Sequence, residues 1–265
     1  MTLKTISSRD NPLYKELKHL ATSSQARRKA GRTLLDGVHL CQAYLQQVGM
    51  PPLCIVSETA VLNSEVTVIL QGCADSIATQ SIVLPDALFH ALSQVEHGVD
   101  ILFVIETPEQ GEPQRLAQPA VLLDKVQDPG NFGSIVRSAA AAGIKQVFCS
   151  PGTTFAWSPK VLRAGMGAHF LIEIFENVDL EALIQRADIP VIATSSYAKQ
   201  RIYDLDLTKP VAWLFGHEGQ GVAEHLLALS THQATIPHLG AIESLNVAAS
   251  SAVCFFEQVR QQTSH

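Results

Sequence analysis

The sequence contains no apolar run that approaches the roughly 20 residues needed to cross a lipid bilayer. Its first residues, MTLKTISSRDNPLYKELK, are polar and lack the apolar core of a secretory signal peptide. We therefore expect a cytoplasmic protein that makes no contact with membranes.

Metal-binding and disulfide patterns are also missing. The five cysteines form no Cys-x-x-Cys pair, so neither a zinc site nor a disulfide framework is expected. The ten histidines are scattered, and Gly221 stands where a zinc protease beginning at His217-Glu218 would need its second histidine. The sequence therefore predicts no metal.

Positive charge is absent from a long part of the chain. No Lys or Arg occurs between residues 33 and 114, and the net charge of the whole chain is −6. Residues 1–32, in contrast, hold eight Lys and Arg against only Asp10 and Glu16. This basic segment fits a phosphate-binding arm and a solvated helix face equally well, so charge alone leaves both interpretations open.

Composition indicates a globular protein, and a linker-like segment divides it into two domains. The 265 residues are 46% hydrophobic and 17% charged, and they suffice for one large domain or two of ordinary size. Residues 106–118, ETPEQGEPQRLAQ, have no apolar periodicity and are typical of a linker. We therefore predict domains at residues 1–105 and 119–265, joined by a linker at 106–118.

Helical and strand patterns alternate in both expected domains. In the first, apolar spacing predicts helices at 12–19, 31–47 and 86–95 and strands at 54–56, 66–70, 81–84 and 101–105. In the second, it predicts strands at 121–123, 147–149, 171–174, 191–195, 211–215 and 234–236, and helices at 132–142, 159–165, 180–187, 222–229 and 245–261. This alternation implies a small α/β/α domain followed by an α/β domain with a mostly parallel sheet covered on both faces.

The most informative segment is residues 122–143, LLDKVQDPGNFGSIVRSAAAAG. An apolar strand runs into an Asp-Pro-Gly-Asn turn that opens an alanine-rich helix, in which we expect Arg137 to be a buried charge. Such a strand-loop-helix gathers backbone N–H groups, the Asn131 amide and the Arg137 guanidinium where α/β proteins bind ligands. The loop lacks both Gly-x-Gly-x-x-Gly and Gly-Lys-Ser/Thr, which argues against a dinucleotide-binding oxidoreductase.

Two further motifs follow predicted strands. Residues 214–221, LFGHEGQG, have three glycines in six positions, which fits either a tight turn or a close approach of the backbone to a ligand. Glu218 within this motif needs a partner for its carboxylate. The third motif, residues 236–250, IPHLGAIESLNVAAS, leads into a helix that Ser244 could cap.

These three motifs, in this order, resemble the SpoU (TrmH) family of RNA ribose 2′-O-methyltransferases over about residues 120–260. Residues 1–105 resemble the substrate-recognition domain that often precedes the catalytic domain in this family. The resemblance implies a SPOUT fold with a deep trefoil knot, S-adenosyl-L-methionine as cofactor, and a homodimer whose subunits can both contribute catalytic groups. It also implies an RNA substrate, with rRNA of the large subunit favoured over tRNA.

The resemblance also assigns roles to individual residues. The implied catalytic residues are Arg137, Asn131, Glu218, Ser244 and Asn246. The implied cofactor-binding residues, which act largely through backbone groups, are Gly216, Ile236, Leu245, Thr194, Leu214, Pro237 and Ala248. The RNA-binding residues expected in the basic segment are Arg9, Lys15, Lys18, Arg27, Arg28, Lys29 and Arg32.

The implied reaction is the attack of a ribose 2′-hydroxyl on the methyl carbon of a sulfonium. A guanidinium stays protonated in proteins, so we expect Arg137 to hold a neighbouring phosphate and to stabilise the developing alkoxide rather than to act as a base. Two alternatives stay open: a tRNA 2′-O-methyltransferase, and a non-catalytic RNA-binding or ribosome-assembly factor with the same fold. The intact set of Asn131, Arg137, Glu218 and Asn246 favours an enzyme.

Overall fold

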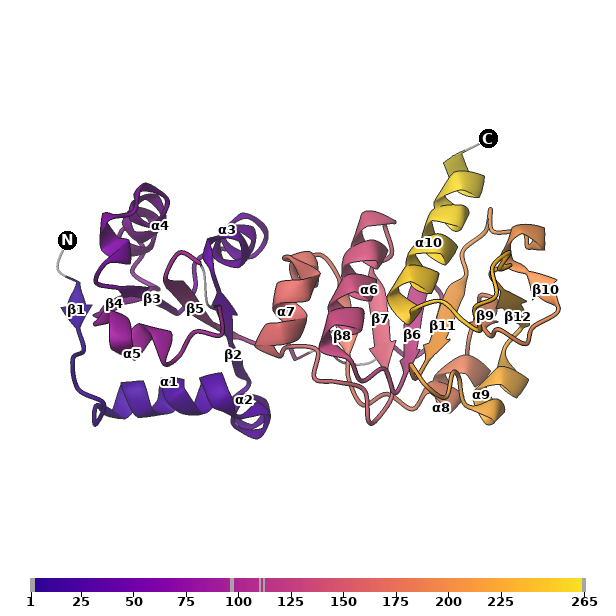
Figure 1. Ribbon diagram of the computed structural model, residues 1–265, viewed down its shortest axis with the longest axis horizontal. Helices are drawn as coiled ribbons and strands as arrows, with labels where there is room; N and C mark the ends of the chain where they lie inside the picture. Colours follow the sequence, from indigo (N-terminus) through magenta and orange to yellow (C-terminus); the bar gives the residue numbers. More distant parts are fainter. Residues whose placement is uncertain (1–2, 96–97, 110, 112, 264–265) are drawn as a thin grey trace. The chain divides into compact units, whose positions relative to one another are not determined.

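The computed structural model of the chain describes residues 3–95, 98–109, 111 and 113–263. Positions 110 and 112 of the expected linker lie outside the described residues, as do positions 1–2, 96–97 and 264–265 of the expected domains. The chain divides into two compact units (Figure 1). The first consists of Met1–Glu109 and Trp157–Phe170, and the second of Gln110–Ala156 and Leu171–His265.

The first unit is built on a sheet whose described strands follow the order β1-β4-β3-β5-β2. Strands β1, β4 and β3 are parallel, whereas β5 is antiparallel to both β3 and β2. The strands are β1 Lys4–Thr5, β2 Arg32–Asp36, β3 Leu53–Ser57, β4 Gln80–Leu84 and β5 Ile101–Glu106. Every residue of β3 is buried, as expected for a strand with helices on both faces of its sheet.

Helices cover both faces of this sheet, with α1 and α2 on one face and α3 and α4 on the other (Figure 1). They are α1 Pro12–Thr22, α2 Ser24–Ala30, α3 Val38–Gln47, α4 Ser64–Ala74 and α5 Asp86–His90, with a short 3-10 helix at Ala60–Leu62. Leu17 and Leu20 of α1 join Leu88 and Phe89 of α5 in one buried apolar cluster. Burial of these side chains against the sheet holds the unit together.

Residues 157–170 belong to the first unit, although we expected them in the second domain. This segment contains α7 (Pro159–Gly165), which packs against β2. The hydroxyl of Thr33 in β2 donates a 2.6 Å hydrogen bond to the carbonyl of Trp157. Ser158 caps α7, as its sequence predicts. The cap signal locates a helix, but it carries no information about the unit on which the helix packs.

The strand expected at residues 66–70 is wrong, because these residues lie inside α4. Val66 and Ile69 are buried whereas Val68 is 69% exposed, which is the spacing of a helix and not of a strand. The run of β-branched residues favoured a strand locally. Asn63 overrides this preference, because its side chain caps α4 by accepting hydrogen bonds from two backbone N–H groups of the first turn.

The single helix expected at residues 31–47 is also wrong, because the structure has β2 followed by α3. Gly37, at a φ of 99°, separates the two elements. Leu34 and Leu35 are both buried, although neighbouring side chains of a strand point to opposite faces. A strand covered on both faces therefore produced an apolar run that fitted a helical pattern.

The second unit contains a sheet whose described strands are all parallel, in the order β10-β12-β9-β11-β6-β7-β8. The strands are β6 Ala120–Asp124, β7 Gln146–Cys149, β8 Glu173–Phe175, β9 Val191–Thr194, β10 Gln200–Arg201, β11 Ala212–Gly216 and β12 His232–Thr235. The predicted α/β class with a mostly parallel sheet is confirmed. The trefoil knot that the resemblance implies stays a prediction.

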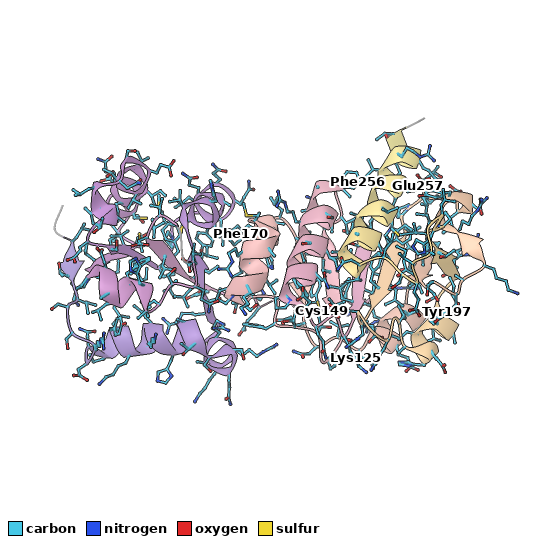
Figure 2. All side chains as sticks on the ribbon, viewed as in Figure 1. Lys125, Cys149, Phe170, Tyr197, Phe256 and Glu257 are labelled. Carbon is cyan, nitrogen blue, oxygen red and sulfur yellow. The ribbon has the colours of Figure 1, made fainter. Side chains whose placement is uncertain are left out.

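Helices α6 and α10 pack together on one face of this sheet, and α8 and α9 pack together on the other (Figure 1). They are α6 Pro129–Ala141, α8 Leu180–Gln185, α9 Glu224–Leu229 and α10 Val247–Thr263, with short 3-10 helices at Ala168–Phe170 in the first unit and Ile202–Asp204 in the second. Side chains alternate along β11, so that Leu214 joins the cluster under α8 and α9, whereas Phe215 packs edge to face on Phe255 of α10. Phe256 of α10, labelled in Figure 2, has an exposed side chain.

A buried hydrogen bond joins α10 to β11. The indole Nε1 of Trp213 donates to Oε1 of Gln258 at 2.8 Å, and both side chains are buried. The change Gln258→Leu leaves this N–H without an acceptor, so the free energy of unfolding should fall by about 1–3 kcal/mol in urea denaturation. The same change at the exposed Gln262 should alter it by less than about 0.5 kcal/mol. Equal losses in both variants would contradict this role of Gln258.

Candidate active site

The three sequence motifs leave the parallel sheet at the same end. They follow β6, β11 and β12, and parallel strands present their carboxyl ends on one side. The register of the central pair places Gly216, the last residue of β11, opposite Asp124, the last residue of β6. The loops that carry the motifs therefore begin side by side.

Asn131 connects the three motifs through hydrogen bonds. Its Nδ2 donates to Oε1 of Glu218 at 3.1 Å, and its Oδ1 accepts from Nδ2 of Asn246 at 2.9 Å. Oδ1 of Asn246 in turn accepts from the N–H groups of Ala248 and Ala249 in the first turn of α10. We call the side chains of Glu218, Asn131 and Asn246 the amide network.

The loop before α6 fixes the position of Asn131. Asp128 caps α6, because its Oδ1 accepts a 2.7 Å hydrogen bond from the N–H of Asn131. The carboxylate of Glu218 accepts from the N–H groups of Gln127 and Asp128 at 3.2 and 3.0 Å. Glu218 therefore holds both the backbone of this loop and the side-chain amide of Asn131.

The pKa of Glu218 lies below its ordinary value of 4.5. Burial raises this pKa, but the hydrogen bonds from Asn131 and from the backbone of Asp128 and Gln127 lower it by more in total. The side chain is thus an ionised acceptor at neutral pH. Since it can only accept, the NH₂ group of Asn131 must face Glu218 and the amide oxygen must face Asn246.

Gly216 is required by the close fold of its own loop. A Cβ atom added to Gly216 would lie 2.0 Å from the carbonyl carbon of Gly221. The buried carboxylate of Asp124 fixes the far end of the loop, because it accepts a 3.0 Å hydrogen bond from the N–H of Ala223. Gly216 therefore serves a tight turn that presents Glu218.

Arg137 is exposed, and the expectation that it is a buried charge is wrong. It follows Asn131 by six residues, which places it roughly 9 Å further along α6 and on a different side of the helix. Its guanidinium makes no hydrogen bond or ion pair with the described residues of the chain. Arg137 therefore stands apart from the amide network.

Ser244 is exposed and makes no hydrogen bond within the described part of the chain. Asn246, and not Ser244, caps α10. The alternative that Ser244 serves as the helix cap is therefore wrong. An asparagine is as good a cap as a serine, so Asn246 can take this position.

The expected cofactor-binding residues lie on the loops and strand ends around the amide network. Leu214 and Gly216 are buried at the end of β11, and the hydroxyl of Thr194 in β9 donates to the carbonyl of Leu214 at 3.3 Å. The remaining four belong to the segment between β12 and the start of α10, where they are half-buried or exposed: Ile236, Pro237, Leu245 and Ala248.

The segment of residues 237–245 has polar groups available for a ligand. Within the described chain its backbone makes no hydrogen bond, and Nε2 of His238 is buried without a partner. Free backbone groups and an unpartnered ring nitrogen fit a polar cofactor that is held through the main chain. His238 belongs to the third motif, but the sequence predicted no role for it, because a lone histidine carries no specific signal.

Residues 118–256, just over half of the chain, match the SpoU rRNA Methylase family. The chain belongs to this family. An uncharacterized tRNA/rRNA methyltransferase of Synechocystis sp. is 32% identical over 98% of this chain and 95% of its own length. The 23S rRNA (guanosine(2553)-2′-O)-methyltransferase RlmP of Bacillus subtilis is 29% identical over 96% of this chain and 98% of its own.

Two solved structures of methyltransferases share the fold over nearly the whole chain. The crystal structure of an RNA 2′-O ribose methyltransferase superposes with a TM-score of 0.81 at 27% identity, covering 97% of this chain and 99% of that one. The SpoU methyltransferase AviRb of Streptomyces viridochromogenes, in complex with AdoMet, gives a TM-score of 0.85 at 23% identity, covering 96% and 99%. The family predicted from the three motifs is confirmed.

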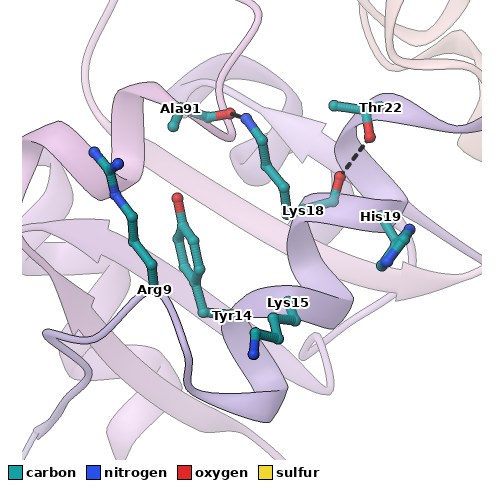
Figure 3. A pocket seen from close by; sticks show the side chains of 7 residues that line it. All are labelled: Arg9, Tyr14, Lys15, Lys18, His19, Thr22 and Ala91. Atoms are coloured by element: carbon teal, nitrogen blue, oxygen red, sulfur yellow. Dashed lines mark hydrogen bonds between the residues drawn. The ribbon is translucent and has the colours of Figure 1, made fainter.

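A basic cavity lies in the first unit of this SpoU protein. It has a volume of about 490 Å³, and Figure 3 shows the side chains that line it: Arg9, Tyr14, Lys15, Lys18, His19, Thr22 and Ala91. Lys18 donates to the carbonyl of Ala91, and the hydroxyl of Tyr14 donates to the carbonyl of Leu88 at 3.1 Å. Three of the seven expected RNA-binding residues therefore gather at one hollow.

Arg27 does not fit the RNA-binding role expected for it. Its side chain is buried, and Nη1 donates to the carbonyls of Leu20 and Ala21 at 2.5 and 3.3 Å. It satisfies the C-terminal carbonyls of α1 instead. Arg32 forms an ion pair with Glu16, whereas Arg28 and Lys29 are exposed on α2.

Other expectations concern absences. No helix in the described part of the chain is long and apolar enough to cross a membrane. Among the described residues, no three His, Cys, Asp or Glu side chains cluster as metal ligands, and the five cysteines are buried and free. The expected lack of a metal and the cytoplasmic location stay predictions.

The depressed pKa of Glu218 has a consequence for stability. Its carboxylate stabilises the folded protein at neutral pH, and this contribution is lost as the pH falls from 4.5 through the lower pKa of the folded state. The change Glu218→Gln should lower the free energy of unfolding by about 1 kcal/mol at about pH 7 and by less in acid. Urea denaturation over this pH range measures the difference.

The matched control is Glu58→Gln, since Glu58 is exposed and its side chain makes no hydrogen bond with described residues. This variant should follow the wild-type curve. A Glu218→Gln variant whose loss of stability stays constant across the pH range would show that the ionised carboxylate is not what the loop depends on.

Proposed function

We propose that this SpoU protein transfers the methyl group of S-adenosyl-L-methionine to a ribose 2′-hydroxyl of RNA, and that its substrate is rRNA of the large subunit. The amide network carries this proposal, because Glu218, Asn131 and Asn246 join three separate loops at the ligand-binding end of the sheet. A protein that only binds RNA does not require these three hydrogen-bonded side chains at a cofactor site. RlmP, which aligns over nearly the full length, is named for ribose methylation of 23S rRNA.

S-adenosyl-L-methionine, when bound, supplies a methyl group on a sulfonium that needs no further activation. The free backbone of residues 237–245 and the unpartnered Nε2 of His238 support a site for it beside the amide network. The residues that would hold it are Thr194, Leu214, Gly216, Ile236, Pro237, Leu245 and Ala248. AviRb, whose fold is the same, was crystallised with AdoMet.

The remaining task of the chain is to orient the ribose and to assist the loss of its proton. Asn131, fixed between an ionised carboxylate and a second amide, is a rigid polar group for positioning the sugar. A guanidinium is a cationic donor with no acceptor, so Arg137 holds the adjacent phosphate and stabilises the alkoxide as the hydroxyl attacks. The proton passes to the phosphate or to water.

We also propose that the protein is a homodimer in which Arg137 of one subunit serves the site of the other. Arg137 is unpaired and lies roughly 9 Å along α6 from Asn131, so one subunit does not bring the two together. The neighbouring helix α10 exposes Phe256, an apolar side chain that suits an interface between subunits.

Recognition of the RNA by the first unit is supported by the basic cavity. Arg9, Lys15 and Lys18 present three cations at its rim, and Asp10 pairs with Lys15 at 2.9 Å. The volume of about 490 Å³ lies within the range of small-ligand sites, so the cavity has room for a single nucleotide of the strand. We propose that RNA phosphates bind at this cavity rather than anywhere on the basic segment.

Arg137→Lys keeps the charge but loses the planar fork, so methyl transfer should fall by about 10²–10³-fold while affinity for S-adenosyl-L-methionine stays nearly unchanged. Transfer of a labelled methyl group to unmodified 23S rRNA measures the first quantity, and calorimetry measures the second. Mixing this variant with Asn131→Ala chains should restore activity, because one site of each mixed dimer is then intact. A fully active Arg137→Lys protein would contradict the role given to Arg137.

The cavity is tested with two double variants that remove equal charge from the first unit. Arg9→Ala with Lys15→Ala alters the cavity, whereas Lys4→Ala with Lys29→Ala removes exposed cations that do not line it. In RNA binding measured against salt, the first pair should reduce the slope of log affinity by about 2 and the second should leave it unchanged. Equal reductions would mean that the basic segment binds RNA without a defined site.

A further inference from the structure

Lys125, the residue directly after β6, has a left-handed backbone with a φ of 55°. Two other non-glycine residues among those described share a positive φ, and each has a local reason. Met166 ends α7, where a left-handed residue is usual, and Asn177 is of a type that tolerates this conformation. Lys125 has neither reason, and such outliers gather at functional sites.

The surroundings of Lys125 hold its backbone in this conformation. Its N–H donates to Oγ of Ser150 at 2.9 Å, and this hydroxyl donates to the buried carboxylate of Asp124 at 3.3 Å. The start of its side chain lies over Gly152, where an added Cβ would meet Cγ of Lys125 at 3.5 Å. Glycine or asparagine would adopt this backbone more easily, so the fold alone gives no reason for a lysine.

The position of Lys125 is that of a ligand-binding residue. It is exposed, it follows β6 directly, and its N–H donates to Ser150, the residue after β7 (Figure 2 labels Lys125 and Cys149). No carboxylate forms an ion pair with its ammonium group among the described residues. Two and three residues further on, Gln127 and Asp128 donate their N–H groups to Glu218. A cation without an ion-pair partner among the described residues therefore lies in the same short loop as the groups that anchor the amide network.

We propose that Lys125 binds a phosphate of the RNA next to the ribose that is methylated. An ammonium group binds phosphate as a compact point charge, and a rigid backbone limits the volume that this charge explores. This inference rests on the proposed function, since it presumes that RNA reaches this end of the sheet. Lys125 would contact the substrate from the same subunit as Asn131. Arg137, under the dimer proposed above, would contact it from the other subunit.

The test compares three variants of the full-length protein in binding unmodified 23S rRNA transcribed in vitro. Lys125→Asn keeps a residue that tolerates the left-handed backbone and removes only the cation. It should weaken RNA binding about tenfold at about 0.1 M salt and reduce the salt slope by about 1. Lys125→Arg should bind as the wild type does.

The control is Lys145→Asn, because Lys145 is an exposed lysine of the same unit that precedes β7, at the opposite end of the sheet. It should leave the salt slope unchanged, and calorimetry should give the same cofactor affinity for all variants. A Lys125→Asn protein that binds RNA like Lys145→Asn overturns the proposal. Methyl transfer is measured separately: a wild type that binds the RNA but does not methylate it would refute the proposed function and leave this test of Lys125 intact.

Discussion

The hydrogen bonds that Asn131 makes to Glu218 and Asn246 are the constraint on which the site depends. Three loops that follow different strands have to be held in one arrangement, and loops are the most mobile parts of a fold. The ionised Glu218 acts only as an acceptor and therefore orients the amide of Asn131. Asn246 extends this connection to α10, because its Nδ2 donates to Asn131 and its Oδ1 accepts from the first turn of the helix. A parallel sheet makes this possible, because it delivers all three loops to one end.

Charge is distributed so that the chain can bind RNA although its net charge is −6. Cations occur where a nucleic acid would be held: at the cavity of the first unit, at Lys125 after the central strand β6, and at the unpaired Arg137 on α6. Each is exposed or lines a hollow, whereas Asp124 and Glu218 fix loops and Asp10 pairs with Lys15 at the cavity. The affinity of such an arrangement depends strongly on salt.

Much of the fold follows from the sequence, since buried parallel strands are continuous apolar runs and Ser158-Pro159 is an unambiguous helix start. That Asn131, Glu218 and Asn246 lie at one edge of the sheet also follows, because the loops after parallel strands leave the sheet at the same end. Other features depend on tertiary contacts. Nothing local shows that residues 157–170 pack with the first unit, and an arginine in an alanine-rich helix looked buried although its side of α6 is exposed. The β-branched run at residues 66–70 became helical because of its cap and its packing.

The dependence of the site on one connected set of hydrogen bonds is tested most directly by a double-mutant cycle of Asn131→Ala and Asn246→Ala on the rate of methyl transfer. If the two amides act as one unit, the double variant should lose little more activity than either single variant, with a coupling energy of about 1–3 kcal/mol. Losses that multiply, with no coupling, would mean that the two side chains act independently and that the amide network does not organise the site.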